Sequence, residues 1–406
     1  MSEEQKRVVL VGCGMVGMSY AYAMLNQNTC DELALIDYVQ EKAEGEAMDL
    51  NHSLAFSNGH MKIWHGDYSD CRDADIVTIC AGVAQKPGQS RRDLLATNTK
   101  VFQSIVEPVL ESGFSGVFLI ATNPVDIMTE IVRRLATNYL TAHGGSPIDP
   151  NRVVGSGTTL DSARLRYMLG DFLDVDPRNI HAYVIGEHGD SEFVPWSQAN
   201  VATKPVLEYC DVSNGKYPID RFEDIETEVR TAAYKIIKAK RATYYGIGMS
   251  LARLSKAILG NEDSVHTVST WLTGQYGESG LYVGNPSIIG ADGVVRTLPL
   301  TLTDQELAKF HASCEVLRGM IGELTCCTGT GQDKQNRKRA EPAGQPAPPS
   351  FQTGPRSRPR LLNPEESSDR ERQSGPLSGQ GRNSCGRTER LGAKCRPPGY
   401  GRNGRR

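Results

Sequence analysis

Several features that mark other protein classes are missing from this 406-residue sequence. No apolar run approaches the roughly 20 residues that a membrane-spanning helix needs, and the polar start, MSEEQKRVVL, lacks the pattern of a signal peptide. The ten cysteines follow no framework, and the close pair Cys326 and Cys327 lacks the spacing of a zinc or redox motif. We therefore expect a reduced, cytoplasmic protein without a membrane segment, a disulfide framework or a bound metal.

Acidic and basic residues are unevenly distributed along the chain. Residues 331–406 contain 17 Lys/Arg and 7 Asp/Glu, whereas residues 1–330 contain 28 and 41. The C-terminal stretch is rich in Gly, Pro, Ser and Arg, so it cannot bury enough apolar surface to offset the entropy of ordering. We predict a disordered basic tail over 325–406, with the bias that a frameshift or read-through of a GC-rich gene produces. A nucleic-acid-binding tail is the alternative, but Phe351 and Tyr400 are its only aromatic residues available for stacking.

The first 150 residues alternate between short, continuous apolar runs and segments of helical periodicity. Such runs are typical of strands buried on both faces of a parallel sheet. Strands are predicted at 7–12, 33–37, 75–82 and 116–121, and helices at 14–28, 91–112 and 124–137. This alternation predicts an α/β domain with a doubly wound parallel sheet over 1–150.

After residue 150 the pattern changes to a mixture of helices and antiparallel strands. Helices are predicted at 158–170 and over 222–257, with a break near 241–246, and a hairpin joins 281–289 to 294–302. Thr303 and Glu306 form a capping box, which opens a helix whose apolar positions step by three and four. We expect a second, α+β domain over 151–324.

A glycine-rich turn stands between the first strand and the first helix. Gly12, Gly14 and Gly17 form GxGxxG, in which glycine permits a tight turn and a close approach of the backbone to a pyrophosphate. Asp37 follows Gly17 by 20 residues, where a carboxylate binds the ribose hydroxyls of NAD and repels the 2′-phosphate of NADP. Asp37 as a mere cap of the next helix is the alternative. Strand, glycines, helix and acid in this order favour a dinucleotide site.

A second constellation centres on His188, which lies in the segment IGEHGDS between two glycines. Histidine exchanges a proton near neutral pH, and it works best when a carboxylate fixes its tautomer. Asp161 and Arg164 lie three apart on a predicted helix and therefore share a face. One could orient His188 while the other binds a substrate carboxylate. An ordinary surface ion pair is the alternative.

These motifs resemble those of the bacterial L-lactate dehydrogenases, within the lactate/malate dehydrogenase superfamily. The similar segments are AGVAQKPGQSR (81–91), ATNPVD (121–126), GSGTTLDSARLR (155–166), IHAYVIGEHGDSEF (180–193) and ATYYGI (242–247). They occur in the family's order from residue 7 to about 324. The resemblance implies a Rossmann domain over 1–150 that binds NAD, a substrate domain over 151–324, and a homotetramer.

The resemblance implies a role for each matching catalytic or substrate-binding residue. His188 would be the proton donor and acceptor, with Asp161 as its partner, and Arg164 would bind the substrate carboxylate. Arg91 would be carried in by a closing loop to polarise the ketone. Substrate contacts would come from Gln85, Arg91, Asn123, Arg164 and Thr243, and cofactor contacts from Gly12, Gly14, Met15, Val16, Gly17, Asp37, Lys42, Tyr68, Gly82, Val83, Asn98, Thr122, Asn123 and Ile247.

Gln85 bears on the substrate. In the resembling enzymes glutamine here accompanies pyruvate and lactate, whereas malate dehydrogenases carry arginine. A second substrate carboxylate needs a cation in a desolvated pocket, and Gln85 provides none. Malate or a bulkier 2-hydroxy acid remains the alternative.

Two further positions match a regulatory pattern, and one departs from the family. Arg166 and His181 stand where lactate dehydrogenases activated by fructose 1,6-bisphosphate carry Arg and His, and a bisphosphate would neutralise cations that repel across a subunit interface. A solvated helix residue and a strand-edge residue are the alternatives. Arg241 stands where glycine is expected, between two predicted helices.

Overall fold

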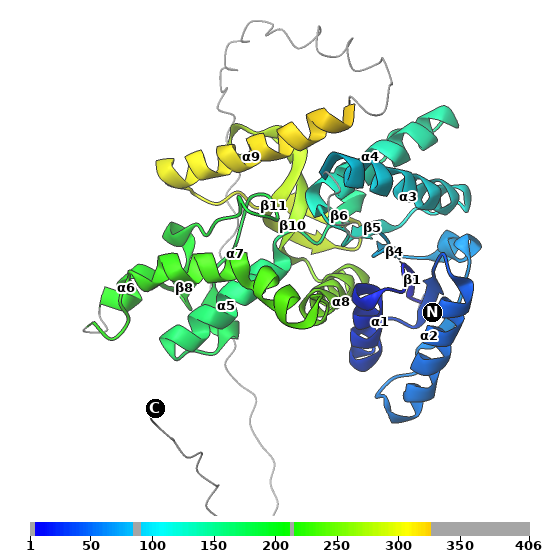
Figure 1. Ribbon diagram of the computed structural model, residues 1–406, viewed down its shortest axis with the longest axis horizontal. Coiled ribbons are helices and arrows are strands. Elements are labelled where there is room, and N and C mark those ends of the chain that lie inside the picture. The colour runs from blue at the N-terminus through cyan, green and yellow to red at the C-terminus, as the bar shows by residue number, and fades with distance from the viewer. Residues whose placement is uncertain (1–4, 84–90, 212–214, 326–406) are drawn as a thin grey trace, which may run out of the picture. The chain divides into compact units, whose positions relative to one another are not determined.

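The computed structural model describes residues 5–83, 91–211 and 215–325 (Figure 1). Gln85 and the predicted tail beyond residue 325, with the nucleic-acid alternative that rests on it, lie outside the described residues. So does the side chain of Arg91, although its backbone is described. Contacts divide the chain into Met1–Arg339 and Ala340–Arg406, and the described residues all lie in the first unit.

A nine-stranded sheet, in the order β12-β11-β10-β6-β5-β4-β1-β2-β3, forms the centre of this unit. The parallel strands are β1 (Arg7–Val11), β2 (Glu32–Ile36), β3 (Lys62–His65), β4 (Ile76–Ile79), β5 (Val117–Ile120) and β6 (Val153–Gly155). The predicted strands at 7–12, 33–37, 75–82 and 116–121 are confirmed. Sequence reasoning missed β3, whose sequence is KIWH, and β6, which has only three residues.

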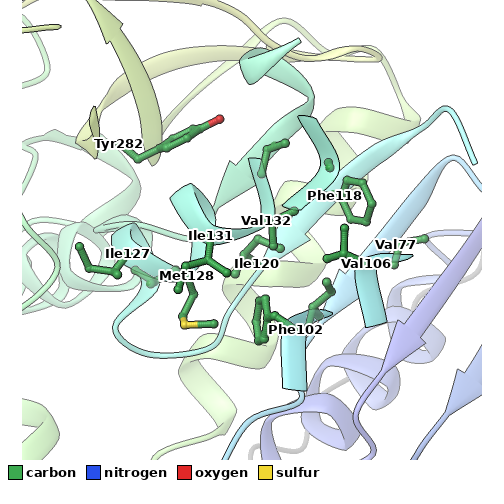
Figure 2. Packing of buried hydrophobic residues seen from close by; sticks show 14 of the residues in the cluster. Val77, Phe102, Val106, Phe118, Ile120, Ile127, Met128, Ile131, Val132 and Tyr282 are labelled. Atoms are coloured by element: carbon green, nitrogen blue, oxygen red, sulfur yellow. The ribbon is translucent and has the colours of Figure 1, made fainter. Parts of the chain in front are cut away.

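Helices cover both faces of the parallel strands. They are α1 (Met15–Gln27), α2 (Gln40–Ser53), α3 (Arg91–Glu111) and α4 (Val125–Ala142). Because strand side chains alternate between faces, Val9 and Val77 join the core under α3 and α4, whereas Val8 and Leu10 join the core under α1 and α2. Figure 2 shows the first of these cores, with Phe102 and Val106 from α3 beside Phe118 and Ile120 from β5.

The second half of the chain extends the same sheet. β10 (Ser264–Thr273), β11 (Ser279–Gly290) and β12 (Gly293–Thr297) are antiparallel, and β10 joins β6 where Ser269 pairs with Gly155. The predicted hairpin is confirmed as β11–β12, although β12 ends at Thr297, before Pro299, which cannot donate to a ladder. β10 was missed because it is buried in its middle and shows no alternation.

A small second sheet consists of β7 (Ile180–His181), β8 (Asn200–Val201) and β9 (Lys204–Pro205). The remaining helices are α5 (Thr159–Leu173), α6 (Val206–Asp211), α7 (Arg221–Lys240), α8 (Tyr245–Leu259) and α9 (Asp304–Thr325). Of these, α5 and α6 pack against the small sheet, whereas α8 and α9 pack on the large sheet and its helices. Short 3-10 turns occur at Leu54–Phe56, Tyr68–Asp73, Pro150–Arg152, Pro177–Asn179, Trp196–Gln198 and Gln275–Gly277. None of the helices in the described ranges has the length and hydropathy of a membrane-spanning segment.

Two predicted helix boundaries have clear physical causes. The capping box is confirmed, because the Glu306 N–H donates to Thr303 Oγ1 and the Thr303 N–H donates to Glu306 Oε2. The predicted break in 222–257 is also confirmed. There Arg241 ends α7 at φ 71°, a left-handed conformation that favours glycine.

Candidate active site

The glycine turn lies between β1 and α1. Gly12 has φ 104°, and a Cβ on it would lie 2.5 Å from the backbone nitrogen of Ala81, at the end of β4. A Cβ on Gly17 would lie 2.0 Å from the Gly12 carbonyl oxygen. Glycine at both positions therefore lets the turn pass close to β4 and to α1. Gly14 caps α1, whose first residue, Met15, is exposed.

Asp37 is tied directly to this turn. Its Oδ2 accepts a hydrogen bond from the Cys13 N–H at 2.8 Å, and its Oδ1 accepts one from the Val39 N–H at 3.0 Å. Lys42 Nζ lies 3.8 Å from Oδ2. The structure thus joins the end of β2 to the glycine turn, with a cation beside the carboxylate.

Four other residues of the expected cofactor set lie beyond the carboxyl ends of β4 and β5. Asn98 Oδ1 accepts from the Val83 N–H at 2.9 Å, and the Thr122 hydroxyl donates to the Ala81 carbonyl at 2.7 Å. A Cβ on Gly82 would lie 2.5 Å from Thr122 Cγ2. The carboxyl ends of parallel strands are where open α/β sheets bind ligands. Val16 and Ile247 pack against one core, and Tyr68 packs against the other.

Asp161 lies between His188 and Arg164. The His188 Nδ1 lies 2.7 Å from Asp161 Oδ2, and Arg164 Nη1 donates to Oδ1, also at 2.7 Å. Asp161 and Arg164 share a face of the first turns of α5, whereas His188 follows β7 in a loop. Only 25% of the His188 side chain is exposed. The expected contact between Asp161 and His188 is therefore present, and Arg164 forms an ion pair with the same carboxylate.

Contacts between opposite charges control the protonation of Asp161 and His188. Burial opposes ionisation of Asp161, but His188 and Arg164 together outweigh it and hold its pKa below the usual value. Burial also opposes the charged form of His188, yet Asp161, helped by Glu192 and Asp126, raises the His188 pKa to about 9. His188 therefore carries a proton at neutral pH, with Nδ1 donating to Asp161.

Asp126, to which we assigned no role from the sequence, anchors the backbone of His188. Its Oδ2 accepts from the His188 N–H at 2.8 Å, and its Oδ1 accepts from the Ser269 hydroxyl. The side chain is buried, and this burial raises the pKa of Asp126 to about 6 against both hydrogen bonds. Asp126 thus links α4, β10 and the His188 loop. The segment ATNPVD (121–126) contains Asp126, but the resemblance implies no role for this residue. The sequence therefore did not single out Asp126.

Asn123 and Thr243, which are also expected to contact the substrate, are not joined to the His188–Asp161–Arg164 group within the described part of the chain. Asn123 is exposed at the end of β5 and forms a cis peptide bond with Pro124. Thr243 is half-buried between α7 and α8. Among the described residues, no hydrogen bond links either side chain to His188, Asp161 or Arg164. Arg91 is the first residue of α3.

Arg166 faces a cavity of about 410 Å³ between α5, α8 and β10. Arg253, His266 and Tyr183 line the same cavity, and Arg166 Nε donates to the Pro177 carbonyl at 3.2 Å. Burial, followed by the nearby Arg253, lowers the pKa of His266 to about 4. His181 is exposed on β7, two residues before Tyr183.

The parallel sheet and the glycine turn tied to Asp37 define a dinucleotide-binding α/β protein. Comparison with protein families makes this specific: the lactate/malate dehydrogenase NAD binding domain matches residues 6–141, and the alpha/beta C-terminal domain of the same family matches residues 158–326. The chain therefore belongs to the lactate/malate dehydrogenase family. This confirms the predicted fold class, the resemblance and NAD as the cofactor.

Individual relatives agree with this assignment. The chain is 53% identical over 318 residues to L-lactate dehydrogenase 2 of Bacillus cereus (strain ZK / E33L), covering 78% of this chain and 98% of that protein. It is 49% identical over 315 residues to L-lactate dehydrogenase of Bacillus caldotenax, covering 78% and 96%. Among solved structures, a lactate dehydrogenase from a Medee basin deep-sea metagenome has a TM-score of 0.75 at 45% identity, covering 79% and 99%. The ligands-bound minor L-lactate dehydrogenase of Enterococcus mundtii has 0.74 at 45%, covering 78% and 98%.

Proposed function

We propose that this enzyme is an L-lactate dehydrogenase that interconverts pyruvate and L-lactate with NAD. The observation that carries the proposal is the His188–Asp161–Arg164 group in a chain of this family. It combines a protonated imidazole with a cation for a substrate carboxylate. The relatives named L-lactate dehydrogenase support the choice of substrate and of L stereochemistry.

The cofactor fits the residues present. Gly12 and Gly17 leave the turn without side chains, and Asp37 faces the same turn beside Lys42. When bound, NADH supplies the hydride. Gly12, Gly14 and the first turn of α1 would hold the pyrophosphate at a helix N-terminus, and Asp37 would hold the ribose hydroxyls.

The chain's own residues handle the substrate and the proton. Arg164 keeps Nη2 for the pyruvate carboxylate, because Nη1 is occupied by Asp161. His188 gives the proton on Nε2 to the ketone oxygen, while Nδ1 stays hydrogen-bonded to Asp161. Arg91, the first residue of α3, would polarise the ketone oxygen. The reverse reaction needs neutral His188, which takes the proton of the lactate hydroxyl.

The substrate is tested by offering pyruvate and oxaloacetate in parallel and following loss of NADH absorbance. We expect a strong preference for pyruvate, because Gln85 provides no cation for a second carboxylate. Preference for oxaloacetate would overturn the substrate assignment. Loss of the pyruvate preference in Gln85→Arg would support the role of Gln85, and an unchanged preference would refute it. Longer 2-keto acids in the same assay test the remaining alternative.

Regulation by fructose 1,6-bisphosphate is part of the proposal, as are a homotetramer and a cytoplasmic location. The support is Arg166, which lines a cavity with Arg253 and His266, and the exposed His181 nearby in the chain. Neutralisation of Arg166 and Arg253 by the bisphosphate would favour subunit association. We expect saturating effector to lower the pyruvate half-saturation and raise the tetramer fraction. Changes in neither would refute the regulatory role of Arg166 and His181.

A further inference from the structure

Glu192 is a buried carboxyl group behind the catalytic histidine that the proposed mechanism does not use. It lies four residues after His188, and 5% of its side chain is exposed. Its Oε2 is 4.0 Å from His188 Nδ1. One carboxylate oxygen each of Asp161 and Glu192 and one ring nitrogen of His188 all lie within 4.8 Å of one another. Among the described residues, the Glu192 carboxyl makes no hydrogen bond, so it is not held there by a structural partner.

Charged groups face Glu192 from several elements. Asp161 and Arg164 face it from α5, and Arg230 faces it from α7. Its own loop contributes His188, whose backbone N–H donates to Asp126 of α4. Arg230 is bound to Glu226 at 3.0 Å, and its Nε is buried without a hydrogen-bond partner within the described part of the chain. Negative and positive neighbours thus surround the Glu192 carboxyl, whose ion-pair contact within the described residues is the one with His188 at 4.0 Å.

Burial, together with repulsion from Asp161, raises the pKa of Glu192 to about 9, against attraction by His188 and Arg164. That is close to the pKa of about 9 for His188. Two groups this near to each other lose their protons as a coupled pair. At neutral pH both therefore hold a proton, and near pH 9 the first proton to leave comes from either group. Loss from Glu192 leaves a carboxylate beside a still-protonated imidazole.

We propose that Glu192 is a positioning residue that extends to higher pH the range over which His188 keeps its catalytic proton. The inference rests on the proposed function, because it assumes that His188 is the proton donor. Glu192 forms no bond to the substrate. It releases its proton to solvent, and the resulting carboxylate attracts the His188 imidazolium, whose Nδ1 lies 4.0 Å away. Pyruvate reduction then continues at pH values where an isolated histidine–aspartate pair has become neutral.

The test compares the wild-type enzyme with Glu192→Gln over pH 6 to 10, in both reaction directions. The amide has the shape of the carboxyl but never ionises, so we expect the alkaline limit of kcat/KM for pyruvate to fall by about one pH unit. Lactate oxidation, which needs neutral His188, should gain its activity about one pH unit lower. Above about pH 9, where Glu192 is ionised in the wild type, the variant should therefore lose pyruvate reduction and gain lactate oxidation, whereas at pH 8 the two enzymes should agree. General damage cannot produce a crossover confined to this range.

Glu278→Gln is the matched control. Glu278 is also buried, but it pairs with His311 and Arg318 outside the site. Its removal should lower stability and leave both pH profiles in place. A Glu192→Gln profile that coincides with wild type would overturn the inference while leaving the proposed function intact. Failure of the wild-type enzyme to reduce pyruvate would instead remove the proposed function.

A second measurement needs no folded variant. Infrared spectroscopy of the wild-type enzyme at pH 8 should show the carbonyl band of a protonated carboxylic acid, because Asp126, with a pKa of about 6, is ionised there. The band should disappear as the pH passes about 9. Absence of the band at pH 8 would show that Glu192 is already ionised and would overturn the inference that its ionisation near pH 9 extends the range of His188.

Discussion

Replacement of Asp126 by asparagine should make the enzyme more stable than wild type as the pH rises. Asparagine can keep both contacts, with Oδ1 accepting from the His188 N–H and Nδ2 donating to the Ser269 hydroxyl. What it removes is a buried negative charge. The carboxyl pKa is raised from 3.8 to about 6 by burial, so its ionisation costs the folded state about 3 kcal/mol at pH 8.

The sign follows from proton binding. A carboxyl whose pKa is raised on folding binds more protons in the folded state, so its contribution to stability is present at pH below 3.8 and is lost as the pH rises through about 6. We therefore expect the unfolding free energy of Asp126→Asn, relative to wild type, to increase by about 1.5 kcal/mol between pH 5 and pH 8.

Urea unfolding at both pH values and equal protein concentration measures this difference. Asp176→Asn is the control, because hydrogen bonds from Arg178 lower the pKa of Asp176 to about 2, so its effect should stay constant over this range. A difference for Asp126→Asn that does not change with pH would refute the reasoning. A change of opposite sign would mean that His188 stabilises the carboxylate more than burial penalises it.

Three further tests probe other parts of the structure by substitution. Arg241→Gly should raise the unfolding free energy by about 1 kcal/mol, because φ is 71° there; a lower Tm would contradict this. Gly12→Ala should lower Tm strongly, since its Cβ would lie 2.5 Å from a backbone nitrogen, whereas Gly14→Ala meets open space; equal effects would contradict the geometry. Asp161→Asn should move the alkaline limit of pyruvate reduction below its position near pH 9; an unmoved limit would remove Asp161 from the control of His188.

Local patterns were enough to predict most of the sheet and its helices. The runs RVVLV, IVTI and VFLI are buried on both faces, so their composition alone marks them as parallel strands. β6 was invisible because three residues carry no periodicity. Sequence also could not indicate that β10 continues the parallel sheet, since this depends on one pairing between Ser269 and Gly155, far apart in the chain.

The candidate site likewise contains residues that local spacing predicted and residues that only packing brings together. The glycine turn, Asp37 and the pair Asp161 and Arg164 are local, so their spacing predicted their proximity. Asp126 and Glu192 depend on packing between segments, because Asp126 reaches His188 from a different helix and Glu192 gains its properties from burial. A carboxylate in a sequence does not indicate whether it will be buried, and burial gives these two residues their raised pKa values.

The central claim is that His188 is the proton donor in pyruvate reduction, and His188→Gln tests it most directly. Glutamine cannot deliver a proton near neutral pH, so kcat/KM for pyruvate should fall by about 10²–10⁴. NADH affinity, measured by fluorescence titration, should stay unchanged, because the glycine turn and Asp37 are untouched. A variant that keeps pyruvate reduction within a few-fold of wild type would contradict the account.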